Sequence, residues 1–202
     1  MSLGPIMELK TDTGVHLELA PFTRDEVVLF ADGFQKESVT QYLAMRAVQT
    51  VETEHDWYDS VIRTMDSVVW GIWVKETGGR KLIGNAALSK ISGGTIVQAV
   101  NGIAIIDEAY WGKGIASAVQ RALVWYGFER RGLTRIQSAV YQPNVGSRKA
   151  LEKAGYTEVY TERNDKFVAG KFVHKDCFEC LNPNRSEEHT SELQSRVDIS
   201  YA

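Results

Sequence analysis

Apolar residues along this chain follow two spacings, and the change between them falls near residue 67. After a loosely alternating strand at Gly14–Phe22, apolar positions three and four residues apart predict helices at about 27–31, 37–48 and 50–65. Thr23-Arg24-Asp25-Glu26 matches the capping box, so the first helix is expected to start there. Alternation then predicts three strands joined by glycine turns into an antiparallel meander: Ser67–Lys75, Lys81–Ile91 and Thr95–Asp107.

Helices and strands alternate in the second half of the chain. Apolar residues at helical spacing run from Ile115 to Tyr126, and a short helix is expected at Val145–Ala154, where Gly155 stops it. Three further strands are expected at Thr134–Gln142, Tyr156–Thr161 and Gly170–Leu181. Residues 163–166 are expected to form a loop. This order predicts a mixed α/β fold, in which helices flank a mostly antiparallel sheet of about seven strands.

Composition narrows the class of protein. The 202 residues suffice for one well-buried domain, and 23 basic against 26 acidic side chains give a net charge of −3. This balance offers no broad basic face for nucleic acid or a membrane. No apolar run reaches the ~20 residues of a membrane span, and residues 1–6 lack the pattern of a secretory signal. We expect a cytoplasmic protein with a disordered or extended segment at 1–12 and a domain at 13–182.

The cysteines Cys177 and Cys180 have the C-x-x-C spacing of a redox pair or of half a zinc site. They fall inside the expected last strand, where alternation points the two side chains to opposite faces. The chain also lacks a second ligand pair at suitable spacing. We therefore expect two free thiols and no metal.

The C-terminal residues have a separate origin in our interpretation. Back-translated, Arg185–Ser195 resembles a widely used sequencing-library adapter, and Ile199–Ala202 resembles its continuation. We assign residues 183–202 to a non-native tail and leave them out of the functional reasoning, as for a fusion scar. The natural C-terminus would then have been lost.

A glycine-rich turn joins a predicted strand to a predicted helix at Tyr110–Ser117. Gly112 and Gly114 permit a tight turn, and the helix that follows offers unpaired N–H groups and a positive dipole end to a phosphate. The turn lacks the frame of a Walker motif and the third glycine of a dinucleotide-binding motif. By itself it is also compatible with a plain strand-to-helix turn.

A second motif decides between these interpretations. Asn144 to Tyr156 reads N-x-x-S followed by L-E-x-x-G-Y. Together with Gly114-Ile115-Ala116, it makes the chain resemble the GNAT superfamily of acyl-CoA-dependent N-acyltransferases from about residue 14 to 181, most of all the branch that acetylates N-termini of ribosomal proteins. Trp111 stands where the family has Gln or Arg. The resemblance implies a GNAT fold, with the sheet splayed between its fourth and fifth strands, and acetyl-CoA as cosubstrate.

The resemblance also implies donor-binding residues. The coenzyme A pyrophosphate would lie on the backbone of the turn, at Gly112, Lys113, Gly114, Ile115, Ala116 and Ser117. The pantetheine arm would lie between the splayed strands, where an N–H group near Ile103, Ala104 or Ile105 would polarise the thioester carbonyl. Asn144 would bind pantetheine, unless it is only a turn residue after Pro143. Ser147 would protonate the departing thiolate, unless it binds coenzyme A or serves the helix backbone.

The catalytic acid and base depart from the family pattern. Asn101, Lys166 and Leu151 occupy the positions where the family has an acid, a glutamate and a tyrosine. As catalytic candidates we take Ser147, Glu108 and Asp165; the two carboxylates are also typical of a solvated surface, as are the other candidates Asp107, Glu162 and His174. The acceptor would contact the segments 34–50 and 163–170 and some of Tyr42, Met45, Arg46, Trp57, Trp70 and Trp73.

The sequence therefore predicts transfer of an acetyl group from acetyl-CoA to a primary amine by direct attack, in a monomer or homodimer. The favoured acceptor is a protein or peptide N-terminus. Two alternatives stay open: an acetyltransferase for a small amine (polyamine, amino acid or antibiotic), and a sensor that binds acyl-CoA without catalysis.

Overall fold

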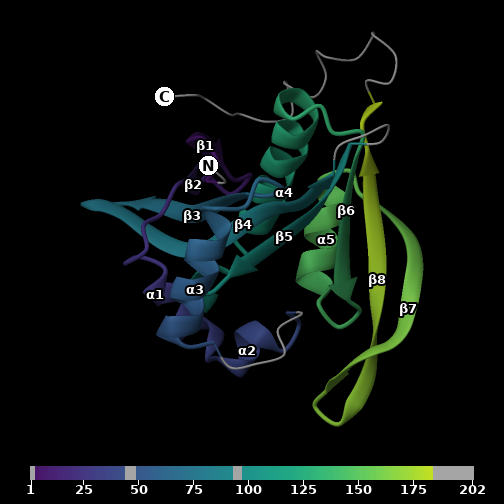
Figure 1. Cartoon of the computed structure of the whole chain (residues 1–202). Helices are drawn as coiled ribbons and strands as arrows, with labels where there is room; N and C mark the ends of the chain where they lie inside the picture. The colour runs from purple at the N-terminus through teal and green to yellow at the C-terminus, as the bar shows by residue number, and fades with distance from the viewer. Residues whose placement is uncertain (1–2, 44–48, 93–96, 184–202) are drawn as a thin grey trace.

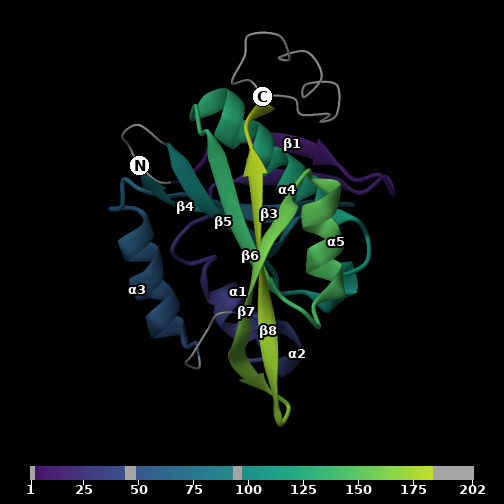
Figure 2. The ribbon, with the colours of Figure 1, turned by 90° about the vertical axis from the view of Figure 1, so that its right-hand side faces the viewer.

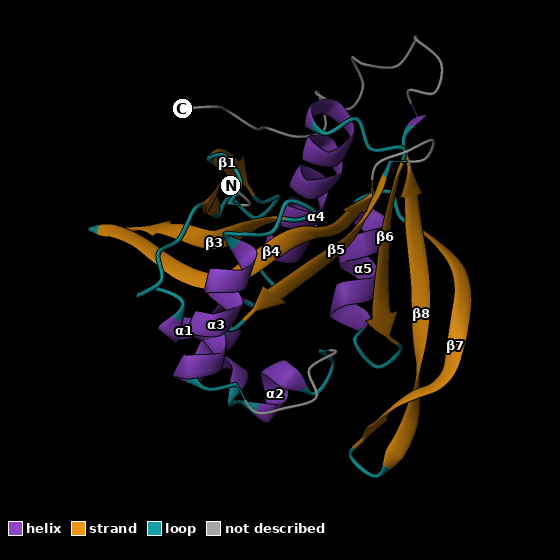
Figure 3. Ribbon diagram, viewed as in Figure 1, coloured by secondary structure: helices purple, strands orange, loops and turns teal. Residues whose placement is uncertain are grey.

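A computed structural model describes residues 3–43, 49–92 and 97–183 of the chain. Within them, eight strands form one central sheet in the order β1-β2-β3-β4-β5-β6-β8-β7, and helices cover both faces (Figures 1 and 3). The strands are β1 (Met7–Lys10), β2 (His16–Ala20), β3 (Val68–Glu76), β4 (Gly79–Ser92), β5 (Gln98–Ile105), β6 (Arg135–Tyr141), β7 (Thr157–Val168) and β8 (Lys171–Leu181). The helices are α1 (Val28–Phe34), α2 (Glu37–Thr40), α3 (Val51–Val61), α4 (Ile115–Trp125) and α5 (Val145–Lys153), with short 3-10 and π turns at Glu108–Tyr110 and Tyr126–Arg130.

The mixed α/β fold is confirmed, and the strand beyond the expected seven is β1. It lies in the segment that we expected to be disordered or extended. Met7 pairs with Leu19 of β2, and the Met7 side chain is fully buried. A strand of four residues shows too little alternation to be recognised from its pattern. Its burial depends instead on contacts with β2 and α4, which come from elsewhere in the chain.

A local signal sets the start of α3, where the Thr50 side chain accepts a hydrogen bond from Thr53 N. The first helix starts later than expected: α1 begins at Val28, beyond the capping box, and its N-cap Val27 makes no side-chain cap. At the capping box, Glu26 Oε2 accepts a hydrogen bond from Thr23 N at 2.7 Å, and Thr23 Oγ1 accepts one from Glu26 N at 3.3 Å. The helix expected at 37–48 is shorter than predicted: α2 ends at Thr40, and residues 41–43 form a turn and a bend. Residues 44–48 lie outside the described part of the chain. The third helix ends at Val61 rather than near Met65. Within the described residues, no helix has the length and apolar character needed to cross a membrane.

The two faces of the sheet carry separate parts of the core (Figures 1 and 2). On one face α4 and α5 pack over β3–β6, and Trp70 meets Tyr126 edge-on with ring centroids 4.9 Å apart. On the other face α1 and α3 pack against each other, where the rings of Phe22 and Trp57 stack at 5.9 Å. The helices that precede the meander therefore lie opposite the helix that follows the glycine turn.

The parallel pair β5–β6 separates along its length. The two strands pair only at Gln98–Arg135, Ala99–Ile136 and Val100–Gln137. Beyond these residues β5 continues to Ile105 and β6 to Tyr141 without pairing to each other, while every other neighbouring pair in the sheet is antiparallel. The predicted splay between the fourth and fifth strands of the sequence pattern is confirmed. Residues 101–105 of β5 and 138–141 of β6 do not pair with each other, although each strand still pairs with its other neighbour. We call these residues the unpaired stretch.

β7 and β8 form a long hairpin at one edge of the sheet, and its tip extends beyond the end of β6 (Figure 1). The prediction of a loop at 163–166 is wrong, because β7 continues through these residues to Val168. The pairing with β8 shifts between Glu162 and Lys166, where Asn164 has a φ of +54°. A bulge thus accommodates polar residues that read as a loop from the sequence.

Candidate active site

Both glycines of the glycine-rich turn have a left-handed backbone conformation. The φ angle is +74° at Gly112 and +77° at Gly114. Gly114 is the N-cap of α4, and its carbonyl accepts the hydrogen bond from Ala118 N at 3.1 Å. Gly114 has no side chain that could cap this helix end. The N-cap itself therefore gives the N–H groups of the first turn no acceptor, a condition that favours binding of an anionic group.

Contacts from distant segments hold the turn in place. Thr13 Oγ1 donates to Lys113 O at 2.8 Å, and Trp111 Nε1 donates to Ile105 O at 3.0 Å. Thr11 lies below Gly114, with 3.7 Å between its Cβ and the position of an added Cβ at Gly114. The support from Thr11 and Thr13 is missing from the sequence interpretation, because no local signal links the β1–β2 connection to a turn a hundred residues later.

The unpaired stretch provides backbone groups for a second part of the ligand. In an extended strand, alternate N–H and C=O groups point to opposite sides. On β5 the groups that face β6 beyond Val100 have no strand partner, and Ile103, Ala104 and Ile105 are half-buried there. An arm that carries amide groups, as pantetheine does, is chemically suited to such an edge.

The first turn of α5 stands beside this stretch. Asn144 is the N-cap of α5, and its Oδ1 accepts from Ser147 N at 3.1 Å. Asn144 thus caps the helix, a role that was not predicted from the sequence, and the cap uses only the oxygen of the amide. In the described part of the chain, Asn144 Nδ2 and the Ser147 hydroxyl donate no hydrogen bond. Both donors remain for a ligand.

The two candidate bases lie where β5 and β6 end. Glu108 follows β5 and accepts a hydrogen bond from the Ser38 hydroxyl of α2. Asp165 of β7 accepts from Tyr141 Oη at 2.9 Å, at the end of β6, and from Lys175 Nζ at 2.9 Å. The hydrogen bond from Lys175 lowers the pKa of Asp165 despite partial burial, so this carboxylate is a weak base.

Three other candidates already have partners. Asp107 pairs with Lys81 at 2.8 Å, which lowers the pKa of Asp107. Glu162 pairs with Lys175 at 2.5 Å. His174 accepts a hydrogen bond at Nδ1 from the backbone N–H of Asn164 at 3.0 Å. These contacts support structural roles.

Two of the positions that depart from the family pattern point away from the acceptor side. Asn101 of β5 faces α4, where its amide nitrogen donates to Gln120 and, at 2.6 Å, to Tyr156 Oη. Leu151 is fully buried in the core between α5 and the sheet. Because their side chains lie behind the sheet, neither substitution removes a group from the side of α1–α3.

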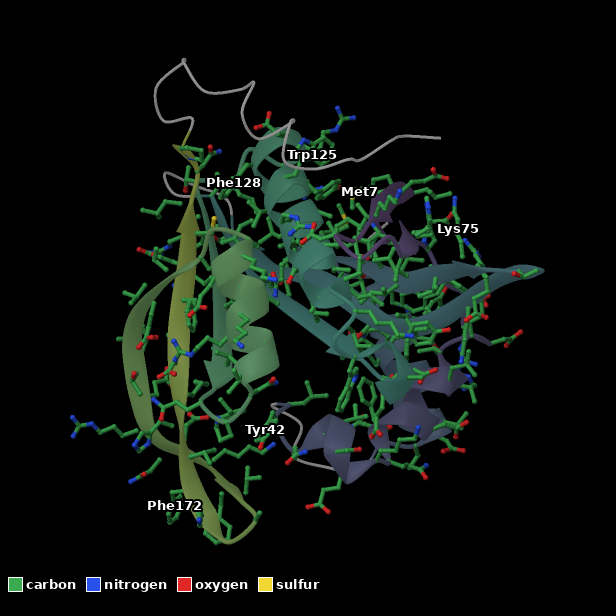
Figure 4. All side chains as sticks on the ribbon, turned by 180° about the vertical axis from the view of Figure 1, so that it is seen from behind. Met7, Tyr42, Lys75, Trp125, Phe128 and Phe172 are labelled. Carbon is green, nitrogen blue, oxygen red and sulfur yellow. The ribbon has the colours of Figure 1, made fainter. Side chains whose placement is uncertain are left out.

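The aromatic residues expected around the acceptor divide between core and surface. Trp70 and Trp73 belong to the two parts of the core on opposite faces of the sheet, and both faces of β3 are buried there. The two side chains therefore do not line the site. Met45 and Arg46 lie outside the described residues. Tyr42 and Trp57 are half-buried, and Figure 4 shows Tyr42 after α2, toward the strands β6–β8.

Comparison with known proteins assigns the family. The model of the acetyltransferase (GNAT) domain matches residues 16–157. The chain belongs to the GNAT acetyltransferase family. It is 24% identical over 184 residues to the probable N-acetyltransferase YjcK of Bacillus subtilis, covering 89% of this chain and 91% of YjcK. It is 30% identical over 178 residues to the uncharacterized N-acetyltransferase YoaA of the same organism, covering 88% and 93%.

Solved structures agree with this fold. A spermidine N-acetyltransferase from Vibrio cholerae, in complex with CoA and spermine, has a TM-score of 0.74 at 18% identity, covering 82% of this chain and 95% of the other. RimJ of Mycobacterium smegmatis, in complex with CoA-disulfide, also has a TM-score of 0.74 at 16% identity, covering 90% and 89%. The uncapped end of α4 and the unpaired stretch therefore fit the coenzyme A that a GNAT acetyltransferase uses.

One contact between the segments that we expected at the acceptor had no signal in the sequence. Lys166 of β7 donates to the carbonyl oxygens of Thr40, Gln41 and Leu43, at 3.3, 2.9 and 2.6 Å. The ammonium group thereby caps the C-terminal end of α2, and it lies 5.4 Å from the ring centroid of Tyr141. Burial lowers the pKa of Lys166. The residue connects the hairpin to α2.

Proposed function

We propose that this acetyltransferase moves the acetyl group of acetyl-CoA to the N-terminus of a protein or peptide. The observation that carries the proposal is the fixed cation of Lys166 between the hairpin and α2. The nearby carboxylates of Glu162 and Asp165 are both paired with Lys175. A polyamine needs several free carboxylates, whereas a peptide N-terminus brings one charge and a backbone that hydrogen-bonds to strands.

The donor would bind across the glycine turn and the unpaired stretch. Backbone N–H groups of residues 112–117 would hold the pyrophosphate at the uncapped end of α4. Asn144 Nδ2 would donate to the pantetheine arm while Asn144 Oδ1 keeps α5 capped. This division of one side chain between helix and ligand makes Asn144 more than a turn residue in our proposal.

The chemistry we propose is direct transfer. The amine nitrogen attacks the thioester carbonyl carbon, the C–N bond forms, the C–S bond breaks, and a proton leaves the nitrogen. An N–H group of β5 at residues 103–105 would stabilise the carbonyl oxygen. The Ser147 hydroxyl would relay a proton to the departing thiolate and take up one from solvent in its place. Lys175 holds the pKa of Asp165 low and makes this carboxylate a poor base, so we assign the proton from the amine to Glu108.

Thiol release from acetyl-CoA tests the proposal with three panels: peptides with free N-termini, the same peptides with blocked N-termini, and polyamines with amino acids. We expect free N-termini to give a kcat/KM about tenfold or more above that of the polyamines, and mass spectrometry to place the acetyl group on the α-amine. Faster turnover of polyamines, or acetylation of the blocked peptides on lysine, would overturn the acceptor assignment. Release of no thiol with any panel would overturn the transfer itself.

A small amine is the second candidate acceptor. The likeness to the spermidine N-acetyltransferase supports it, since its TM-score of 0.74 equals that of RimJ. The polyamine arm of the same experiment therefore decides between the two acceptor classes.

A further inference from the structure

The carboxylate of Asp176 on β8 is fully buried and bound by three side chains. Its Oδ1 accepts from Thr161 Oγ1 at 2.7 Å and from Gln142 Nε2 at 3.0 Å, and its Oδ2 accepts from the guanidinium group of Arg148. Burial alone would raise the pKa of Asp176, but the two neutral donors and the charge of Arg148 outweigh it and hold the pKa below its ordinary value. Asp176 is thus a buried anion held in one position.

Two of these partners stand on either side of the segment that we assign to coenzyme A. Gln142 follows β6, and Arg148 lies in α5; Asn144 and Ser147 come between them. Gln142 also donates its backbone N–H to His174 O at 3.0 Å, which fixes the same segment to β8 a second time. Asp176 therefore binds both ends of the segment 142–148.

Arg148 extends this anchor to the neighbouring strand. Its guanidinium group donates to Glu158 of β7 at 2.8 Å and lies 5.1 Å from the ring centroid of Phe178 on β8. The planar group can bind two carboxylates and a ring face at once, which an ammonium group cannot do. Figure 2 shows α5 beside β6, β7 and β8, the arrangement that these contacts fix.

We propose that Asp176 and Arg148 are positioning residues for coenzyme A. They fix the start of α5 so that Asn144 Nδ2 and the Ser147 hydroxyl meet the donor, although neither Asp176 nor Arg148 touches it. The inference rests on the proposed donor-binding role of Asn144 and Ser147. Removing one partner of a buried ion pair leaves the other uncompensated, so the segment has to move and cannot simply relax in place.

The variant Asp176→Asn tests this proposal because it keeps the size of the side chain and one accepting oxygen. It removes the negative charge that pairs with the guanidinium group of Arg148. We expect the Kd for coenzyme A, measured by calorimetry, and the KM for acetyl-CoA to rise about tenfold each. The KM for the acceptor should change by less than about twofold. A merely structural role would reduce the folded fraction, and hence kcat and binding stoichiometry, without moving the Kd.

Four further variants sharpen the result. Arg148→Lys keeps the charge, and we expect part of the affinity to remain, whereas Arg148→Gln should match Asp176→Asn. The double variant Asp176→Asn with Arg148→Gln should be no weaker in binding than either single change, because both act through one contact. Glu18→Gln is the matched control, since this carboxylate binds Arg80 on the distant β2–β4 side of the sheet; its Kd should stay at the wild-type value.

The outcomes separate this inference from the proposed function. A folded Asp176→Asn protein with the wild-type Kd overturns the positioning role alone. A wild-type protein that binds no coenzyme A overturns the proposed donor site, and the positioning role with it.

Discussion

At the scale of single residues, Gly114 shows what the donor site demands. Its φ of +77° lies in the region that side chains rarely adopt, yet an added Cβ would be 3.7 Å from Thr11, an ordinary contact distance. Backbone conformation, and not space, therefore requires glycine here.

Gly114→Asp should weaken coenzyme A binding strongly, because it adds both a strained backbone and a negative charge where a pyrophosphate is expected. A left-handed non-glycine residue costs about 1–2 kcal/mol, and charge repulsion adds to this. We expect calorimetry to show a Kd at least about tenfold higher, with Gly114→Ala affected less. Gly170→Ala is the control, because its φ of +80° gives similar strain at the tip of the hairpin. Equal binding by wild type and Gly114→Asp would remove the turn from the donor site.

Glu54 of α3 makes stability depend on pH. The residue is buried, and burial raises its pKa from 4.5 to about 7. Because the folded state then holds a proton that the unfolded chain releases, the contribution of Glu54 to stability is complete below about pH 4.5 and is lost as the pH rises through about 7.

Glu54→Gln should therefore stabilise the protein at pH 8 and have little effect at pH 4.5. We expect the difference in unfolding free energy from wild type to grow by about 2 kcal/mol between these values, measured by urea unfolding. Glu52→Gln on the same helix is the control. Its pKa is lowered by its own backbone N–H and by Thr50, so its pH dependence should have the opposite sign. A pH-independent effect of Glu54→Gln would show that the carboxyl is not held neutral.

At the scale of elements, the hairpin and α2 approach each other on the acceptor side. Lys166 connects them through three carbonyl oxygens at the end of a helix of only four residues. So short a helix is not stable by itself. Its position therefore depends on this contact from a strand more than a hundred residues away.

Lys166→Met should disturb the acceptor side and leave the donor side intact. The methionine keeps most of the apolar stem and loses all three hydrogen bonds. We expect the KM for the acceptor to rise several-fold, with an unchanged KM for acetyl-CoA, the reverse of the result expected for Asp176→Asn. Lys171→Met, at an exposed lysine of the same hairpin, should match the wild type. A rise in both KM values would mean that Lys166 supports the whole site.

Most elements could be predicted because their signals are local. Alternation in the meander and the glycine stop at Gly155 each depend on a few neighbouring residues. The capping box at Thr23 also forms its hydrogen bonds, but α1 starts only at Val28. The bulged part of β7 could not be predicted, because its polar residues are held by pairing with β8 and not by their own pattern. The same reason applies to β1.

At the scale of the whole molecule, the last strand of the chain, β8, lies between β6 and β7 in the sheet. After β8, Asn182 donates to Thr134 O at 3.0 Å and to Leu133 O at 2.9 Å. These bonds tie the chain to the start of β6 before the segment that we assign to a non-native tail.

A chain that ends at Asn184 should therefore keep the stability and donor binding of the full chain. We expect its Tm to stay within about 2 °C and its Kd for coenzyme A to be unchanged. A chain that ends at Lys175 is the control, because it loses most of the pairing of β8 with β6 and should not fold. A clear loss of stability on removal of residues 185–202 alone would contradict the assignment of the tail.

The sequence by itself determined the family, the order of the elements after β1 and the two turns that we assign to the donor, because Gly112, Gly114 and Asn144 act through backbone conformation and capping that neighbouring residues dictate. Only the tertiary structure decided which of the charged groups are free. The pairing of Asp165 with Lys175, the three carbonyls at Lys166 and the buried ion pair of Arg148 and Asp176 join residues from separate elements. Electrostatic interactions depend on distance and burial, and no spacing along the chain specifies either one.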